Sequence, residues 1–186
     1  MNAAAAREGT LLLCVDMQPV FVRTVADGPK VLERCKFAVA AAQGLGIAVA
    51  FTEQVPQKLG GTDPALLALA ASPEVHTKSQ FSALAPGGPV AAAAAKRRVS
   101  HVVVCGVETP ICVFQTGMDA LRAGLSVTVL SDCVGARRGA DAAVCLEHLA
   151  LSGAQVIPSE TFFYGLLGDA KHPFFREFTE LVKKHA

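Results

Sequence analysis

The sequence predicts one α/β domain in which a parallel sheet lies between two layers of helices. Short apolar runs alternate along the chain with longer amphipathic or alanine-rich stretches, and this alternation is typical of parallel βαβ units. No linker, repeat or low-complexity stretch divides the 186 residues, so we expect a single domain over residues 1–186. Apolar residues make up 52% of the chain and charged residues 18%, a balance that excludes intrinsic disorder.

Six apolar runs are the predicted strands. Continuous runs of four or five mostly apolar residues suit strands that are buried on both faces of a sheet. The third run is the weakest of the six, and the fourth, which ends at Gly106, is the clearest. In chain order the runs are Leu11–Val15, Ile47–Phe51, Val75–Lys78, His101–Cys105, Ser126–Leu130 and Ala154–Ile157.

Helices are predicted in the segments between these runs. Pro29 suits the first turn of a helix, and Gly44 suits its end. The last segment of the chain places five apolar side chains on one helical face, Phe174, Phe175, Phe178, Leu181 and Val182. The predicted helices cover about 29–43, 89–97, 110–123, 140–152 and 173–184.

Charge and hydropathy exclude several classes of partner. A net charge of +1 and a pI near 7.6 give no attraction to nucleic acid or to an anionic membrane. The two short basic clusters, Lys96–Arg98 and Arg137–Arg138, are interpreted as solvated helix or loop ends. No apolar run reaches the roughly 18–20 residues of a membrane helix. The first residues do not form a secretory signal peptide, so we expect a cytoplasmic location, with a mitochondrial one left open.

The six cysteines are not read as a disulfide framework, because the chain is large and contains no CxxC pair. Most of them are expected to be small buried apolar side chains. Cys112 differs, because it lies one turn into a helix that is predicted to begin near Pro110. A helix N-terminus lowers the pKa of a thiol, which favours a nucleophile. A buried packing role is the alternative.

Two further polar residues stand at the carboxyl ends of predicted strands, where ligands bind in open α/β sheets. Asp16 follows the first strand and suits a general base, although it also suits a helix cap. Lys78 ends the third strand, from which its ammonium can reach over the sheet edge. Its alternative role is that of an ordinary solvated lysine.

Taken in order, three motifs resemble those of the isochorismatase-like cysteine hydrolase family. They are Asp-Met-Gln-Pro-x-Phe from Asp16, Lys-x-x-Phe-Ser from Lys78, and Gly-Val-Glu-Thr-Pro-Ile-Cys-Val from Gly106. The similarity covers about Leu11 to Val156, and the Thr52–Pro56 stretch looks closest to the isochorismatase domain-containing protein branch.

The resemblance implies a six-stranded parallel sheet in a three-layer α/β/α fold, with strand order 3-2-1-4-5-6. It further implies an Asp16–Lys78–Cys112 triad and a cis peptide bond between Val107 and Glu108. Backbone N–H groups near Glu108 and Cys112 would then face an oxyanion.

Other residues of the same motifs are expected to bind the oxyanion or the substrate. These residues are Gln18, Phe21, Gln54, Glu108 and Thr109. Glu108 stands where amidases of the family often carry a small residue, so it either reads a cationic group or obstructs the pocket. The remaining pocket walls are expected from residues 53–64, 81–90 and 160–168.

A metal site is not expected. Nicotinamidases of this family bind a metal through Asp-x-His after the second strand, whereas this chain has Glu53-Gln54-Val55 there. We therefore predict no metal and no cofactor, and we do not expect nicotinamide to be the substrate.

The resemblance and the residues together predict a hydrolase of a small-molecule amide-type C–N bond. Cys112 would attack the carbonyl carbon, Asp16 would take the thiol proton, and a thioester would form and then be hydrolysed. The alternative is a catalytically weak oligomeric interaction protein of the same fold. In either case we expect a homo-oligomer.

Overall fold

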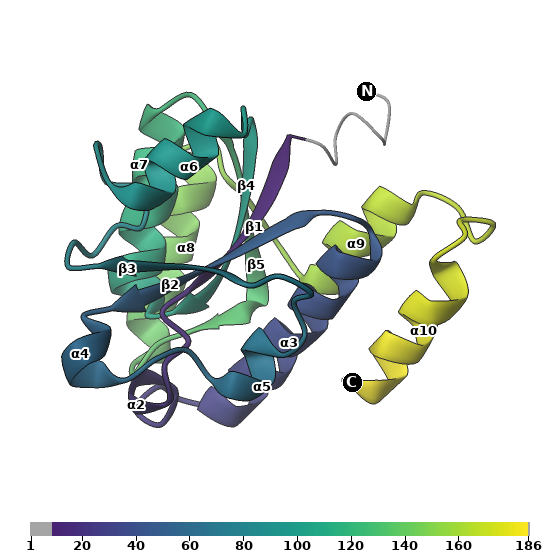
Figure 1. Ribbon diagram of the computed structural model, residues 1–186, viewed down its shortest axis with the longest axis horizontal. Coiled ribbons are helices and arrows are strands. Elements are labelled where there is room, and N and C mark those ends of the chain that lie inside the picture. Colours follow the sequence, from purple (N-terminus) through teal and green to yellow (C-terminus); the bar gives the residue numbers. More distant parts are fainter. Residues whose placement is uncertain (1–8, 186) are drawn as a thin grey trace.

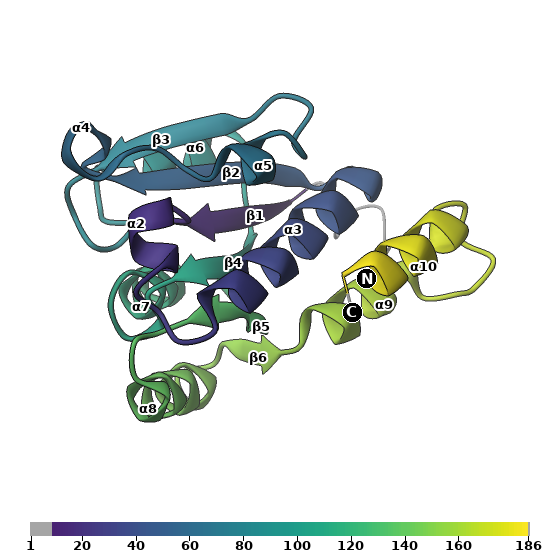
Figure 2. The same ribbon diagram turned by 90° about the horizontal axis from the view of Figure 1, so that it is seen from below.

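A six-stranded, all-parallel sheet forms the centre of the molecule. The computed structural model describes residues 9–185, and the strand order is β3-β2-β1-β4-β5-β6, as the family resemblance implied (Figures 1 and 2). All six predicted strands are present. They are β1 Thr10–Val15, β2 Ala48–Gln54, β3 Glu74–Lys78, β4 His101–Val107, β5 Ser126–Gly135 and β6 Gln155–Ile157.

Helices cover both faces of the sheet and give the predicted three layers (Figure 1). One face carries α3 Gly28–Gly44, α5 Pro64–Leu67, α9 Ser159–Leu167 and α10 Phe175–Lys184. The other carries α6 Pro89–Lys96, α7 Phe114–Arg122 and α8 Gly139–Leu151. The short helices α2 Pro19–Val22 and α4 Pro56–Leu59 follow β1 and β2, and the π-helical turn η1 Thr109–Val113 follows β4. Among the helices of residues 9–185, none is long and apolar enough to cross a membrane.

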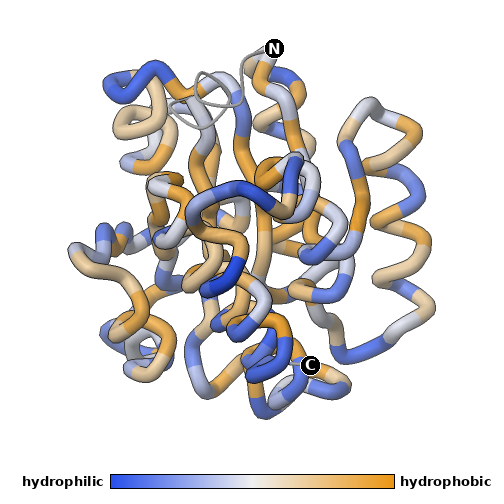
Figure 3. Tube along the Cα trace, turned by 90° about the vertical axis from the view of Figure 1, so that its right-hand side faces the viewer, coloured by the Kyte–Doolittle hydropathy of each residue, from blue (hydrophilic) through white to orange (hydrophobic). Residues whose placement is uncertain are grey.

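Alternation of side chains along the strands divides the core into two parts. Leu12 and Cys14 of β1 face α3, whereas Leu11 and Leu13 face the layer of α6 and α7. The tube coloured by hydropathy shows apolar segments running through the middle of the molecule and polar ones around it (Figure 3). The sheet is therefore buried on both sides, which is why its strands are continuous apolar runs.

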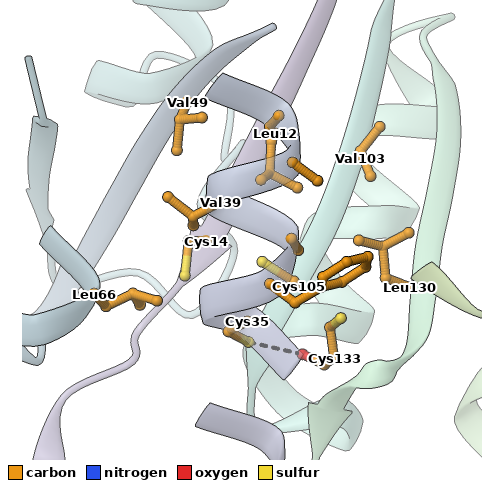
Figure 4. Packing of buried hydrophobic residues seen from close by; sticks show 14 of the residues in the cluster. Leu12, Cys14, Cys35, Val39, Val49, Leu66, Val103, Cys105, Leu130 and Cys133 are labelled. Carbon is orange, nitrogen blue, oxygen red and sulfur yellow. Dashed lines mark hydrogen bonds between the residues drawn. The ribbon is translucent and has the colours of Figure 1, made fainter. Parts of the chain in front are cut away.

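Four of the cysteines pack in the core beneath α3 (Figure 4). The sulfur atoms of Cys14, Cys35 and Cys105 lie within 4.8 Å of one another. The Cys35 thiol also donates a hydrogen bond of 3.2 Å to the backbone oxygen of Cys133. All four are buried with free thiols, which confirms the expectation that most cysteines act as small apolar side chains.

An aromatic cluster fixes the C-terminal helix on the domain. The ring of Phe178 in α10 lies 5.6 Å from Phe37 of α3 and 4.9 Å from Tyr164 of α9, centroid to centroid. Phe178 itself is fully buried. The apolar face predicted for this segment therefore closes the core of its own chain.

A polar network beside this cluster ties three elements together. Arg34 of α3 donates from Nε to Asp132 of β5 at 2.9 Å and from Nη2 to Ser159 of α9 at 2.8 Å. Ser159 in turn donates to Asp132 through both its backbone N–H and its hydroxyl, each at 2.7 Å. Burial alone would raise the pKa of Asp132, but the hydrogen bonds from Ser159 and the Arg34 charge outweigh burial and lower it.

We expect Phe178→Ala to lower the free energy of unfolding by about 3–5 kcal/mol, because it leaves a cavity among the packed rings. Denaturant unfolding at neutral pH measures this loss. Lys183→Ala on the same helix is the matched control, since the Lys183 side chain is 71% exposed and its truncation should change stability by no more than about 0.5 kcal/mol. Equal losses for the two variants would contradict the packing described for α10.

We expect Asp132→Asn to lower the free energy of unfolding by about 1.5–3 kcal/mol at pH 7. Because folding lowers the pKa of Asp132, its contribution is present above the unfolded value of about 4 and is lost as pH falls through the folded value. The variant should therefore approach the wild type in stability at acid pH. Asp141→Asn, which breaks only the exposed pair with Arg138, is the control in the same pH series of denaturant unfolding.

Candidate active site

The carboxyl ends of β1, β3 and β4 bring Asp16, Lys78 and Cys112 together at one edge of the sheet. β1 and β4 are neighbours, with Val15 paired to Gly106. Gly106 has a φ of 113°, and a Cβ atom there would lie 2.1 Å from the backbone oxygen of Val15. Only glycine allows the two strands to approach so closely at this position, which lets the residues that follow them meet.

Asp16 and Lys78 form a buried ion pair. The Lys78 Nζ lies 2.6 Å from Asp16 Oδ2, and the two side chains are 2% and 1% exposed. Thr52 of β2 donates from its hydroxyl to the other carboxylate oxygen, Oδ1, at 2.7 Å. Asp16 also has a positive φ of 50°, a conformation that Asp tolerates better than most residues. Both oxygens of the carboxylate are therefore fixed from two different strands.

The Lys78 ammonium has a full set of acceptors. Besides Asp16 it donates to Gln54 Oε1 at 2.7 Å and to the backbone oxygens of Gln80 and Phe81 at 3.2 and 3.1 Å. The Cys112 sulfur lies 3.8 Å away. These contacts fix the charge beside the thiol and pay for the burial of both ions.

Cys112 lies in η1, directly after β4. The peptide bond between Val107 and Glu108 is cis. The backbone oxygen of Glu108 accepts hydrogen bonds from Ile111 N–H at 3.1 Å and Val113 N–H at 3.2 Å. The wider π-helical turn continues into α7, and turns of this kind are frequent at functional sites.

The expected lowering of the Cys112 pKa is wrong. Burial and, after it, the Asp16 carboxylate raise the pKa of the Cys112 thiol to about 12, because the Lys78 ammonium opposes the rise only in part. A thiol with this pKa is protonated at neutral pH. The sequence showed the start of a helix, but burial and the neighbouring carboxylate have the larger effect.

A cavity of about 80 Å³ opens beside the thiol. Phe81 stands at its mouth and is 55% exposed. Larger grooves lie elsewhere on the surface: one of about 780 Å³ beside Glu74 and Arg97 contains none of the three residues, and one of about 310 Å³ beside Pro56 has Lys78 in its wall. The cavity is lined by Asp16, Phe21, Gln54, Phe81, Val107, Glu108, Ile111 and Cys112.

The residues expected at the substrate site fall into two groups. Phe21, Gln54 and Glu108 line the cavity. Gln18 and Thr109 are fully buried and are absent from the lining. The Gln18 amide instead accepts from Gln54 N–H at 2.7 Å and donates to Gln54 O at 3.1 Å, so it holds the strand end that carries Gln54.

The expected pocket walls are correct only in part. Gln54 and Phe81 come from the segments 53–64 and 81–90. The segment 160–168 contributes nothing, because α9 lies away from the carboxyl ends of the strands: its Phe162 ring contacts His101 at the start of β4. A sequence pattern does not show where a helix after β6 will pack.

Arg137 is a cavity-side residue that the sequence interpretation missed. Its Nε donates to Glu108 Oε2 at 2.9 Å, and the side chain is 60% exposed. Val107 of β4 pairs with Gly135 of β5, which places the loop after β5 beside Glu108. The position of Arg137 in a short basic cluster suggested a solvated loop end, and nothing in the sequence linked Arg137 to Glu108, 29 positions away.

The stretch Glu53–Val55, where metal-binding relatives carry Asp-x-His, is occupied by structural contacts. Glu53 accepts from Thr62 N–H at 2.7 Å, and Gln54 accepts from Lys78. Within residues 9–185, the three-thiol group of Cys14, Cys35 and Cys105 is the set of side chains close enough to hold a metal ion. That group lies in the apolar core and not at the cavity.

Known proteins resemble this chain over nearly its whole length. The isochorismatase domain family model matches residues 10–161. The isochorismatase domain-containing protein 2 of Bos taurus is 37% identical over 174 residues, which are 94% of this chain and 82% of that protein. Its Xenopus laevis counterpart is 34% identical over 180 residues, 97% of this chain and 86% of that protein.

Solved structures give the same result. The MAR1 ribonuclease from Caenorhabditis elegans has a TM-score of 0.88 at 30% identity, covering 95% of this chain and 91% of that one. The Escherichia coli YcaC gene product, described as an octameric hydrolase of unknown specificity, has a TM-score of 0.81 at 17% identity, covering 96% and 94%. The latter likeness concerns the fold alone. Because the family model covers most of its length and the Bos taurus and Xenopus laevis relatives are 37% and 34% identical to it, the chain belongs to the isochorismatase family.

Proposed function

We propose that this protein hydrolyses a small-molecule amide-type C–N bond through Cys112 as nucleophile. The observation that carries the proposal is the buried Asp16–Lys78 ion pair beside the Cys112 thiol, inside a small cavity. A fold that only needed stability would gain little from two buried charges next to a thiol. A cysteine nucleophile requires a base and a fixed positive charge in this arrangement.

The protonation states follow from the geometry. Asp16 and Lys78 lie in ion-pair contact, and the Cys112 thiol keeps its proton because burial and the Asp16 carboxylate raise its pKa to about 12. Asp16 is then the base that accepts this proton when the substrate carbonyl is in place. Lys78, 3.8 Å from Sγ, stabilises the anion as it forms.

Bond making and breaking then proceed in two stages. The Cys112 sulfur attacks the carbonyl carbon, and the developing oxyanion is met by the backbone N–H of Cys112 in the first turn of η1. The C–N bond breaks, and the amine leaves with the proton held by Asp16. Water, deprotonated by Asp16, hydrolyses the thioester, which releases the acid and restores the thiol.

A ribonuclease function is the other candidate, because the C. elegans relative is named a ribonuclease. The contacts of this chain favour a small molecule. The cavity of about 80 Å³ is far smaller than a nucleotide, and Asp16 and Glu108 place carboxylates along it. At the cavity Arg137 is paired with Glu108, and the nearby Arg138 is paired with Asp141, whereas an RNA site needs cations free for phosphates.

We also propose that the protein forms a homo-oligomer. Val144 and Leu151 of α8 are 67% and 82% exposed, one heptad apart on the same helical face. An apolar pair in that position suits contact with a second copy. This surface also serves the alternative interaction-protein function, which requires no turnover.

We expect Cys112→Ser to reduce hydrolysis of any accepted amide by at least about a thousandfold, because a serine hydroxyl beside Asp16 is a much weaker nucleophile than a thiol. The assay screens small primary amides for ammonia release and traps the thioester on the intact protein by mass spectrometry. Cys145→Ser, at a half-buried thiol of α8, is the control and should leave turnover unchanged. RNA cleavage by the wild type that survives Cys112→Ser, with no amide turned over, would overturn the proposal.

Substitution of either ion should shift the pKa of Cys112 in opposite directions. Asp16→Asn removes the carboxylate that raises the thiol pKa, so alkylation by iodoacetamide at a fixed pH between about 7 and 10 should become faster although turnover is lost. Lys78→Met removes the opposing ammonium, so alkylation should slow. Mass-mapped labelling over a pH series measures both. Unchanged labelling in Asp16→Asn would show that the carboxylate does not face the thiol.

A further inference from the structure

The proposed mechanism does not use one charged pair near Cys112, Glu108 with Arg137. Glu108 directly precedes η1, and its side chain is 12% exposed. Its carboxylate lines the same cavity of about 80 Å³ as the thiol. A molecule that fills so small a space contacts both residues at once. Any ligand that binds next to Cys112 therefore also contacts Glu108.

The charges of the site determine which substrate groups Glu108 can bind. The Lys78 ammonium is enclosed by four oxygen acceptors at 2.6–3.2 Å, so it has no donor left for a substrate carboxylate. Arg137 turns its Nε to Glu108 Oε2. Among the described residues no donor contacts the second oxygen, Oε1. The polar group offered to the substrate is thus a hydrogen-bond acceptor that carries negative charge.

Arg137 has a separate task in this arrangement. It holds one oxygen of Glu108, which fixes the orientation of the carboxylate. The Arg137 side chain itself is 60% exposed. Arg137 is accordingly a positioning residue and Glu108 the residue that touches the substrate.

We propose that the Glu108–Arg137 pair is the specificity determinant of this site, and that it selects small substrates that present free N–H groups over substrates that present a carboxylate. Glu108 Oε1 accepts a hydrogen bond from the substrate –NH₂ while Phe21, Phe81 and Ile111 enclose its apolar part. Carboxylates are rejected by charge repulsion. This inference rests on the proposed nucleophile and narrows its substrate class, and it excludes anionic substrates such as isochorismate.

The test compares two reagents of nearly the same shape, acrylamide and acrylate. In each, the Cys112 sulfur bonds to the terminal carbon, and the thiol proton passes through Asp16 to the carbon beside the carbonyl. The rate of Cys112 modification is followed by peptide mass mapping on the full chain. The rate with acrylamide is divided by the rate with acrylate, which cancels any change in the reactivity of the thiol. This ratio is then divided by the same ratio for glutathione, which cancels the intrinsic electrophilicity of the two reagents.

Wild-type protein should prefer acrylamide by about tenfold or more after this correction. Glu108→Gln should bring the corrected ratio close to one or below it, because Arg137 then attracts acrylate with no carboxylate to oppose it. Arg137→Ala should move the ratio the other way, further against acrylate, and Arg137→Lys should restore the wild-type value. A merely structural pair would not give opposite shifts for the two variants.

Arg138→Ala is the matched control, because Arg138 is the adjacent arginine, is 79% exposed and pairs with Asp141. Its ratio should equal that of the wild type. A ratio that does not change in Glu108→Gln, or that moves the same way in both pair variants, overturns the inference while Cys112 remains a nucleophile. If neither reagent modifies Cys112 in the folded wild type, the inference and the proposed function both fail. If the ratios shift as expected and no amide is hydrolysed, the specificity pair stands and only the proposed function fails.

Discussion

The ion pair between Asp16 and Lys78 connects strands that are distant in sequence and carries the chemistry proposed for the site. Two opposite charges, 2.6 Å apart and almost without solvent contact, are stable in a protein interior only when further hydrogen bonds satisfy both. Thr52 satisfies the carboxylate. Gln54 and two backbone oxygens satisfy the ammonium. The geometry of the carboxyl ends of β1, β2 and β3 is thereby fixed around one pair of charges.

The strand order makes this arrangement possible. Because β1 lies between β2 and β4, the loop after β1 faces both the Lys78 side of the sheet and the turn that carries Cys112. Gly106 lets β4 approach β1 closely at that point. On one face of the sheet, the strands pack against the cysteine-rich core under α3, and the aromatic contacts of α10 hold α10 on α3. The three residues Asp16, Lys78 and Cys112 thus lie at or just after strand ends, and the loops contribute mainly the entrance of the cavity.

Burial explains why the site holds a protonated thiol near a carboxylate and not a preformed thiolate. The start of a helix favours a thiolate, yet at Cys112 desolvation and the Asp16 charge raise the pKa to about 12. In the proposed mechanism, the protonated Cys112 remains unreactive until a substrate is bound. Glu108 lines the same small cavity, so that the proposed selection and the proposed chemistry share one space.

The sequence by itself determined the alternation of strands and helices, the six strands and the positions of Asp16, Lys78 and Cys112 at strand ends, because these follow from local apolar runs and from motif spacing. It missed the one-turn helices α2, α4 and α5, which are too short to show a period. Tertiary structure alone decided three other features. They are the raised pKa of Cys112, the inward role of Gln18 and the pairing of Arg137 with Glu108. Each depends on burial or on contact between residues of different strands, and a local pattern carries no information about either.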